Sequence, residues 1–357
     1  MVDKLCLITF SNNADHQNVV YSMYKALKGK VEVYTVGIVN PKSDSAVFDD
    51  HNIYCNCPER PGIGKGTFRI GVLLELARRI KKEGITHLYF ESQHLWNAAL
   101  MVLCPQCRKI VAVHDVIPHD GNKAMDLSNF VTCQMADHII LRNRMFKETL
   151  SKRCKVPMEK ISCQEPWRDF RPYAAPHCTG IFLCFGRIRR YKGLDKLVRI
   201  IKATPENSYR IVGEPDEESR PLVEELKRLS NARVVDREVS DGEMVRELEN
   251  ADWLVLPYTA ATQSGVIVDT FVHGRPVIAF DVGAISEQVT DGYNGRLVPE
   301  GDVDGFIKAV REASACTAEE LGTYSRNAYH FAYERYSAEA AAESFLKNVT
   351  LQATEKA

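Results

Sequence analysis

The chain has almost no net charge and no long apolar run. Its 357 residues include 46 Lys and Arg against 47 Asp and Glu, a formal net charge of −1. This balance argues against a protein that binds nucleic acid through bulk positive charge. No run approaches the ~18 apolar residues of a transmembrane helix, and the opening residues MVDKLCLI lack the layout of a signal peptide. These absences predict a cytoplasmic protein.

Two common nucleotide-binding motifs are also missing. Residues 61–67 (PGIGKGT) resemble a P-loop, but Glu59 stands where Walker A needs glycine, and Gly66 follows Lys65 where Ser or Thr is needed. No strand-linked G-x-G-x-x-G occurs, so a nicotinamide or flavin enzyme is not supported. No D-x-D-type motif stands in a persuasive context, and we predict no metal requirement.

Eleven cysteines are present, which in such a chain indicates reduced thiols and small core residues. The alternative is a zinc site, because Cys55-x-Cys57 and Cys104-x-x-Cys107 would together supply four thiolates. The first pair is spaced more tightly than usual, and Cys104 stands beside Pro105 after an apolar helical run. The thiol interpretation is therefore favoured over zinc.

Short apolar runs alternate with helical patterns, which predicts an α/β fold with doubly wound parallel sheets. Predicted strands are residues 4–10, 31–38, 86–91, 109–113, 137–141, 181–185, 209–212, 232–236, 253–257, 276–280 and 296–298. Predicted helices are residues 16–28, 68–83, 94–103, 142–151, 192–203, 217–229, 241–250 and 265–273, with helical structure again beyond residue 315. Residues 164–178 hold three prolines and little periodicity. They read as a linker between two Rossmann-like domains.

The most informative segment is residues 180–193, GIFLCFGRIRRYKG. A buried strand ends at Gly186, and Arg187 and Lys192 follow in the loop before a predicted helix. A guanidinium, an ammonium and a helix dipole then converge on one place, as a diphosphate requires. The alternative is a basic loop without a ligand.

Further segments follow in a definite order. They are residues 251–258 (ADWLVLPY), 261–266 (ATQSGV), 274–279 (GRPVIA), 281–287 (DVGAISE) and 291–298 (DGYNGRLV). Together with residues 180–193 they resemble the nucleotide-binding domain of retaining glycosyltransferases of family 4 (glycosyl transferases group 1), which have the GT-B fold.

This resemblance implies two Rossmann-like doubly wound domains that face each other across a cleft. The expected division is an acceptor-side domain over residues 1–165 and a nucleotide-sugar-binding domain over residues 176–335. A C-terminal helix over residues 336–357 is expected to return to the N-terminal domain.

In glycosyl transfer from a nucleotide sugar, negative charge builds on the leaving phosphate, and Arg187 and Lys192 are suited to stabilise it. The family commonly opens the next loop with a Glu, where this chain has Ala261. Instead, four residues at a helix start are expected to form an anion nest for the phosphate or sugar. They are Thr262, Ser264, Gly265 and Val266. Ser264 as a plain helix N-cap is the alternative.

The remaining donor-side candidates flank this loop. Asp269 replaces the family's second acid, which holds the ribose hydroxyls, although a solvated helical Asp is an equal alternative. Gly186, Gly213 and Glu214 are expected at the rim of the nucleotide site. The sequence leaves the base open between uracil and guanine.

In the N-terminal domain, His114 ends a predicted strand, and the resemblance implies that it contacts the donor sugar. The alternative is a strand-end His bonded to Asp115. His119 and His94 are weaker candidates. The first loop lacks the family's glycines, and its Asn12, Asn13 and His16 are the acceptor-side candidates.

The resemblance implies a retaining, metal-independent transferase that moves a sugar from a UDP- or GDP-linked donor to a hydroxyl acceptor. Bacterial surface polysaccharide or glycolipid synthesis is its expected setting, with a glycan or lipid-linked acceptor and no nucleic acid. Peripheral contact with the inner face of a membrane would use basic residues of the N-terminal domain. These are Arg142, Arg144, Lys147, Lys152, Arg153 and Lys155. The alternatives are a catalytically silent GT-B subunit that binds glycan or supports a partner, and a nucleotide-sugar epimerase.

Overall fold

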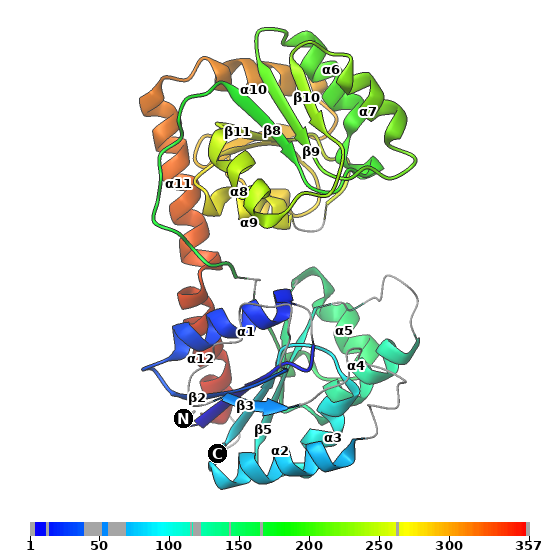
Figure 1. The fold of residues 1–357 in the computed structure, drawn as a ribbon, viewed down its shortest axis with the longest axis vertical. Helices are drawn as coiled ribbons and strands as arrows, with labels where there is room; N and C mark the ends of the chain where they lie inside the picture. Colours follow the sequence, from blue (N-terminus) through cyan, green and yellow to red (C-terminus); the bar gives the residue numbers. More distant parts are fainter. Residues whose placement is uncertain are drawn as a thin grey trace. The chain divides into compact units, whose positions relative to one another are not determined.

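The computed structural model describes residues 4–11, 14–38, 52–55, 69–114, 116, 123–142, 144–164, 167–261 and 264–354. The chain divides into two compact units (Figure 1). The N-terminal unit comprises residues 1–169 and 336–357, and the C-terminal unit comprises residues 170–335. The sequence predicts domains over residues 1–165 and 176–335, with a linker over residues 164–178 and a C-terminal helix over residues 336–357.

Within the described residues, the N-terminal unit contains one parallel sheet with the strand order β3-β2-β1-β4-β5-β6-β7. Its strands are β1 (Lys4–Ile8), β2 (Glu32–Ile38), β3 (Asn52–Cys55), β4 (His87–Phe90), β5 (Arg108–Val113), β6 (His138–Leu141) and β7 (Ile161–Cys163). The central strands β4 and β6 are buried at every position. This explains why they read as continuous apolar runs without alternation.

Helices cover both faces of this sheet (Figure 1). They are α1 (Ala14–Leu27), α2 (Ile70–Lys82), α3 (Leu95–Leu103), α4 (Lys123–Met135), α5 (Lys147–Cys154) and α12 (Ala338–Thr354), with 3-10 turns η2 (Arg144–Phe146) and η3 (Met158–Lys160). Leu5 and Leu7 of β1 pack in one core with α1 and with Phe345 of α12. Cys6 and Ile8 point into the other core, with α2, α3 and α5. The alternating direction of side chains along a strand separates the two cores.

The C-terminal unit contains a second parallel sheet with the order β10-β9-β8-β11-β12-β13. The strands are β8 (Ile181–Phe185), β9 (Ser208–Val212), β10 (Ala232–Val235), β11 (Trp253–Leu256), β12 (Val277–Asp281) and β13 (Gly295–Pro299). The helices are α6 (Leu194–Ala203), α7 (Arg220–Lys227), α8 (Asp241–Asn250), α9 (Gly265–Val272), α10 (Val303–Ser314) and α11 (Ala318–Tyr336), with 3-10 turns η4 (Arg190–Lys192) and η5 (Ile285–Glu287). Both units are therefore Rossmann-like, which confirms the predicted fold class.

Arg275 in the conspicuous Gly-Arg-Pro segment has a structural role. Its side chain is 1% exposed and donates hydrogen bonds to the carbonyls of Leu248 (3.0 Å) and Glu249 (2.9 Å). These carbonyls lie in the last turn of α8, where the i+4 donors of the helix are missing, and the Leu248 carbonyl also accepts from the Ala251 N–H at 3.3 Å. Arg275 therefore caps α8 from the start of β12.

Four elements were missing from the sequence prediction: β3, α4, β7 and α10. The strands β3 and β7 are short edge strands. A helix was predicted over residues 142–151, but Arg142 is buried at the end of β6 and the α-helix begins only at Lys147.

Candidate functional site

The loop after β8 places Gly186 where no other residue fits easily. Its φ is +95°, and a Cβ atom there would lie 2.9 Å from Nζ of Lys192 and 3.2 Å from a methyl of Val266. Positive φ favours glycine, and the missing side chain lets a cation and a helix start approach the strand end. The predicted positions Gly186, Lys192 and Val266 therefore meet in space.

Lys192 is a buried cation, with 4% of its surface exposed. Its Nζ donates a hydrogen bond to the carbonyl of Phe185 at 3.0 Å and lies 5.5 Å from the centre of the Tyr258 ring. Burial lowers the pKa of Lys192 to about 8, with a smaller contribution in the same direction from Arg189. A buried ammonium with one neutral acceptor gains most from a nearby anion.

Arg187 differs from Lys192 in exposure. Its side chain is exposed and makes no hydrogen bond or ion pair within the described part of the chain. A guanidinium offers five donors in a planar fork that matches phosphate oxygens. Arg187 therefore retains its donors for a ligand, whereas Lys192 is already anchored.

Both cations line a pocket of about 880 Å³ in the C-terminal unit. The pocket is lined by Arg187, Arg189, Arg190, Tyr191, Lys192, Asp216, Thr259 and Val266. A second pocket of about 420 Å³ is lined by Tyr191, Lys192, Tyr258, Ala260, Ala261, Ser264, Gly265 and Val266. The two share Tyr191, Lys192 and Val266, so they adjoin. Both lie at the carboxyl ends of the parallel strands, where open α/β sheets bind ligands.

Ser264 precedes α9 at its N-cap position, but its side chain makes no capping hydrogen bond. Its backbone is held instead by Gln288, whose Oε1 accepts from the Ser264 N–H at 2.9 Å and whose Nε2 donates to the Ser264 carbonyl at 3.2 Å. The N–H groups of Gly265 and Val266 open the helix and have no acceptor within it. The helix start therefore offers a hydroxyl and free helical amides to the smaller pocket.

The other donor-side candidates lie outside the two pocket linings. Asp269 is half-buried on α9, and its carbonyl accepts from Nδ1 of His273 at 2.7 Å. Gly213 is buried and its N–H donates to Val235, and Glu214 is exposed. Thr262 lies outside the described residues. The roles proposed for these four remain predictions.

Several pocket residues were not singled out from the sequence. Tyr191 is 45% exposed at the pocket wall, and its carbonyl accepts from the Thr259 N–H at 2.8 Å. Asp216 follows β9 and lies 3.8 Å from Nε of Arg189. The position of Asp216 after a predicted strand could have marked it as a candidate site residue. Nothing in the sequence indicates that Gln288 contacts Ser264.

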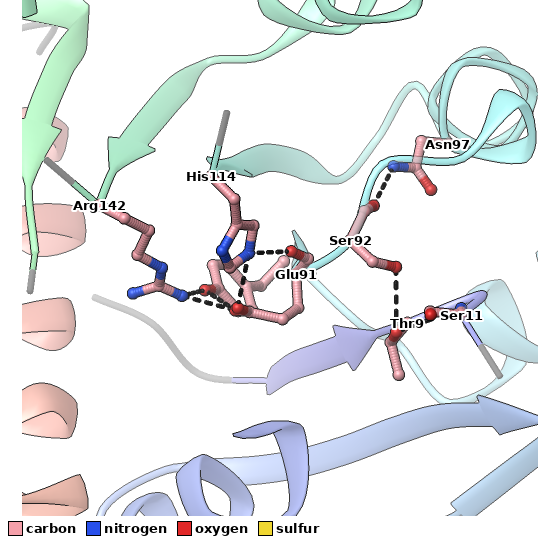
Figure 2. A network of polar contacts seen from close by, with 8 residues as sticks. Thr9, Ser11, Glu91, Ser92, Asn97, His114 and Arg142 are labelled. Carbon is pink, nitrogen blue, oxygen red and sulfur yellow. Dashed lines mark hydrogen bonds and ion pairs between the residues drawn. The ribbon is translucent and has the colours of Figure 1, made fainter. Parts of the chain in front are cut away.

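In the N-terminal unit, His114 lies at the carboxyl end of β5 and faces Glu91 (Figure 2). Its Nε2 donates to the backbone carbonyl of Glu91 at 2.8 Å and lies 3.0 Å from Glu91 Oε1. Arg142 contacts the same carboxylate from the end of β6, with Nη2 2.6 Å from Oε2. Arg142 is thus not part of an exposed basic face, which removes it from the predicted membrane-facing set. Asp115, the alternative partner of His114, lies outside the described residues.

Of the remaining histidine and first-loop candidates, the structure describes only the side chain of His94. His94 is buried, its Nδ1 accepts from the Trp96 N–H at 3.1 Å, and burial lowers its pKa to about 4. It therefore caps α3 as a neutral imidazole. Asn12, Asn13, His119 and the side chain of His16 lie outside the described residues.

Of the two cysteine pairs considered for zinc, the structure describes Cys104 and Cys107 but only part of the other pair. Cys104 and Cys107 are buried thiols, and Cys107 Sγ donates to the Ile85 carbonyl at 3.1 Å. Cys57 lies outside the described residues. Within the described ranges, no three His, Cys, Asp or Glu side chains come together as a metal site. In the same ranges, no helix has the length and apolar character needed to cross a bilayer.

Comparison with known proteins gives a family match within the C-terminal unit. Residues 179–315 match the family model described as glycosyl transferases group 1. The C-terminal unit is similar to glycosyl transferases of this group over that range. The matched range contains residues 186–193, both pockets and the Gln288 contact.

Curated relatives resemble part of the chain. The GDP-mannose:glycolipid 4-beta-D-mannosyltransferase of Xanthomonas campestris is 30% identical over 154 residues, 40% of this chain and 44% of that protein. The phosphatidyl-myo-inositol mannosyltransferase of Mycolicibacterium smegmatis is 29% identical over 118 residues, 33% of this chain and 30% of that protein. The matched segments thus span less than half the length of these relatives.

Solved structures resemble the whole chain. HepE of Anabaena, solved with UDP, aligns with a TM-score of 0.66 and 13% identity over 98% of this chain and 99% of that one. Sucrose-phosphate synthase of Thermosynechococcus elongatus aligns with a TM-score of 0.64 and 16% identity over 99% and 100%. At these identities the likeness establishes the GT-B fold.

Proposed function

We propose that the protein is a retaining glycosyltransferase that moves a sugar from a UDP- or GDP-linked donor to a hydroxyl acceptor. The observation that carries the proposal is the convergence of Arg187, Lys192 and the start of α9 on two adjoining pockets. A diphosphate at this place would meet two cations and the positive end of a helix dipole. Negative charge that develops on the leaving phosphate would then be stabilised by groups already in position.

Lys192 is well matched to this role. Its pKa of about 8 keeps most of the amine protonated at neutral pH, and a bound diphosphate would favour the charged form further. Because the Nζ is held by Phe185, little reorganisation is needed when charge develops. The two cations supply this stabilisation themselves, so we propose transfer without a required metal ion.

The retention of anomeric configuration that the sequence resemblance implies is proposed to proceed without a covalent nucleophile. Asp216 is the one carboxylate in the described lining of the two pockets, and it is engaged by Arg189 and by the Ser219 N–H at 2.9 Å. We therefore propose front-face attack assisted by the leaving phosphate. The hydroxyl acceptor is proposed to be a glycan or glycolipid, since the matched Xanthomonas relative is named as a glycolipid mannosyltransferase.

A second candidate is a GT-B subunit that binds nucleotide without transfer. Ala261 favours it, because this residue lines the smaller pocket where the family commonly places a carboxylate. Release of UDP or GDP from a panel of nucleotide sugars, measured with EDTA and with candidate acceptors, separates the two. Acceptor-dependent release that is lost in Arg187→Ala supports transfer. Tight binding with no release for any donor supports the subunit, and no binding at all contradicts both.

A further inference from the structure

The C-terminal unit has a further pocket, of about 550 Å³, whose lining comes from the segments 179–181, 208–210, 230–233 and 247–250. Ile181 begins β8, Ser208 begins β9 and Asn231 directly precedes β10, so the pocket lies at the amino ends of three neighbouring strands. We call it the amino-edge pocket. It shares no lining residue with the two pockets at the carboxyl ends of the strands. The amino-edge pocket is therefore a separate site.

Two arginines stand side by side in the amino-edge pocket. Arg210 of β9 and Arg233 of β10 are register partners in the parallel sheet, so their Cα atoms lie about 4.8 Å apart. Both side chains line the pocket and therefore point to the same face of the sheet. Like charges at directly paired positions repel each other and destabilise a sheet. An anion bound between the two guanidiniums would remove this repulsion.

Glu247 of α8 neutralises only one of the two arginines. Its Oε2 accepts from Nε of Arg210 at 2.9 Å, and its Oε1 accepts from Nη2 of the same side chain. Nη1 of Arg210 makes no hydrogen bond within the described residues. Arg233 is exposed and, among the same residues, has neither a hydrogen bond nor an ion pair. One positive charge and several N–H donors thus remain for a ligand.

The carbonyl groups at the end of α8, which would repel an anion, already have donors. The Asn250 carbonyl accepts from the Thr179 hydroxyl at 2.7 Å. Arg275 donates to the carbonyls of Leu248 and Glu249 from outside the pocket lining. These bonds offset the partial negative charge of a helix C-terminus. The arginine pair therefore dominates the electrostatics of the pocket.

The neutral groups of the lining indicate the rest of the ligand. The side chains of Ser208, Ser230 and Asn250 are exposed and make no hydrogen bond within the described chain, so they can bind sugar hydroxyls. Tyr209, the one aromatic residue of this described lining, is 2% exposed and offers no ring face to a nucleobase. The lining therefore suits a sugar better than a nucleotide.

The anionic group is best matched by a phosphate. A phosphate monoester has three terminal oxygens, which two guanidiniums can share, whereas a carboxylate has only two. We propose that the amino-edge pocket binds a hexose phosphate, with the phosphate between Arg210 and Arg233 and the hydroxyls on Ser208, Ser230 and Asn250. Its volume of about 550 Å³ lies within the usual range of small-molecule sites. The site does not depend on the transfer reaction proposed above.

Isothermal titration of the full-length wild type at low salt tests the proposal with glucose 6-phosphate and mannose 1-phosphate. Inorganic phosphate and glucose are the matched probes, because each carries one part of the chemistry of the ligand. At least one hexose phosphate is expected to bind at one site, about tenfold or more tightly than either part. If inorganic phosphate binds as tightly, the arginines form only an anion patch, which overturns the proposal. Binding of neither hexose phosphate also overturns it.

Arg233→Gln locates the binding. The variant loses one charge-assisted contact to the phosphate, and its affinity for the hexose phosphate should fall about tenfold or more. Arg246→Gln is the control, since Arg246 is an exposed cation of α8 outside the pocket lining. Arg187→Ala is a second control for binding at the carboxyl edge. Both controls should bind like the wild type. An unchanged affinity in Arg233→Gln, or an equal loss in Arg187→Ala, would overturn the site without bearing on nucleotide binding.

Discussion

The Nζ of Lys192 donates a hydrogen bond to the carbonyl oxygen of Phe185 at 3.0 Å. Phe185 ends β8 and Lys192 ends the 3-10 turn η4, so the bond closes the loop of residues 186–192. It holds the buried cation against the strand end, while the neighbouring Arg187 stays exposed and without a partner among the described residues. In the proposed function, Lys192 would be in place before a diphosphate binds, and Arg187 would be available to contact it.

Arg187→Ala and Lys192→Ala should reduce turnover more than they reduce stability. Each removes charge stabilisation that grows as the leaving group departs, and a loss of about 10²-fold or more in kcat is expected. Steady-state kinetics and thermal unfolding of the purified variants measure the two effects. Arg199→Ala is the control, because Arg199 is an exposed cation on the nearby helix α6. Retained turnover in both folded variants would place the donor phosphate elsewhere.

Binding of a nucleoside diphosphate should weaken as pH rises through about 8. The lowered pKa of Lys192 means that the amine is charged below about pH 8 and neutral above it in the free protein. An anion prefers the charged form, so the affinity for UDP or GDP should fall from pH 7 to pH 9.5. Calorimetry across this range measures the change. Lys192→Met should bind more weakly and remove this pH dependence, and an equal slope in the variant would contradict the assignment.

Gly186→Ala should weaken nucleotide binding as well as lower stability through backbone strain. The new Cβ would lie 2.9 Å from Lys192 Nζ and would force the cation or Val266 to move. Gly301→Ala is a matched control, since Gly301 has a φ of +75° but open space around the added Cβ. Both variants should lose about 1 kcal/mol or more of stability from the left-handed conformation. Only Gly186→Ala should weaken nucleotide binding in calorimetry. Equal nucleotide affinities of the two variants would show that the close approach of Lys192 and Val266 to Gly186 does not matter for binding.

Gln288→Ala should loosen the start of α9. Gln288 is 2% exposed and makes two hydrogen bonds to the backbone of Ser264. Its loss removes the acceptor of the Ser264 N–H, whereas the Ser264 carbonyl keeps the N–H groups of Ile267 and Val268. A destabilisation of about 1–3 kcal/mol is expected, with weaker nucleotide binding. Denaturant unfolding and calorimetry measure both. Asn327→Ala, which loses one hydrogen bond to the Tyr293 carbonyl, should leave nucleotide affinity unchanged. Unchanged affinity in Gln288→Ala would separate Ser264 from the donor site.

His114→Ala should discriminate between the nucleotide and the sugar. Affinity for free UDP or GDP should stay nearly unchanged, because its proposed site lies in the C-terminal unit. Turnover or binding of the complete nucleotide sugar should weaken by about 1–3 kcal/mol for a lost hydrogen bond. A structural histidine would instead lower thermal stability and affect both ligands alike.

The sequence predicted the parts of the protein that depend on local pattern. Continuous apolar runs such as residues 181–185 mark buried parallel strands, and Arg187 and Lys192 stand in one loop directly after such a run. Helix α10 was missed although Val303, Phe306 and Val310 recur at helical spacing and Asp302 caps it through the Gly305 N–H. That signal was present in the sequence.

Other contacts had no local signal. Gln288 reaches Ser264 over 24 residues, and Glu91 meets Arg142 over 51 residues. Such pairs depend on which strand ends become neighbours in the sheet. Arg142 illustrates the consequence: its sequence neighbours made it look like part of a basic surface, whereas β4 brings it a buried carboxylate.

We propose that Arg187 and Lys192 bind the diphosphate of a nucleotide sugar. Isothermal titration of the wild type and Arg187→Ala with UDP and with GDP, in the presence of EDTA, measures this binding. We expect saturable binding of at least one of the two nucleotides at one site in the wild type, weakened about tenfold or more in the variant, consistent with a charge-assisted hydrogen bond of ~1.5–3 kcal/mol. Wild-type protein that binds neither nucleotide, or a variant that binds as tightly as the wild type, would contradict it.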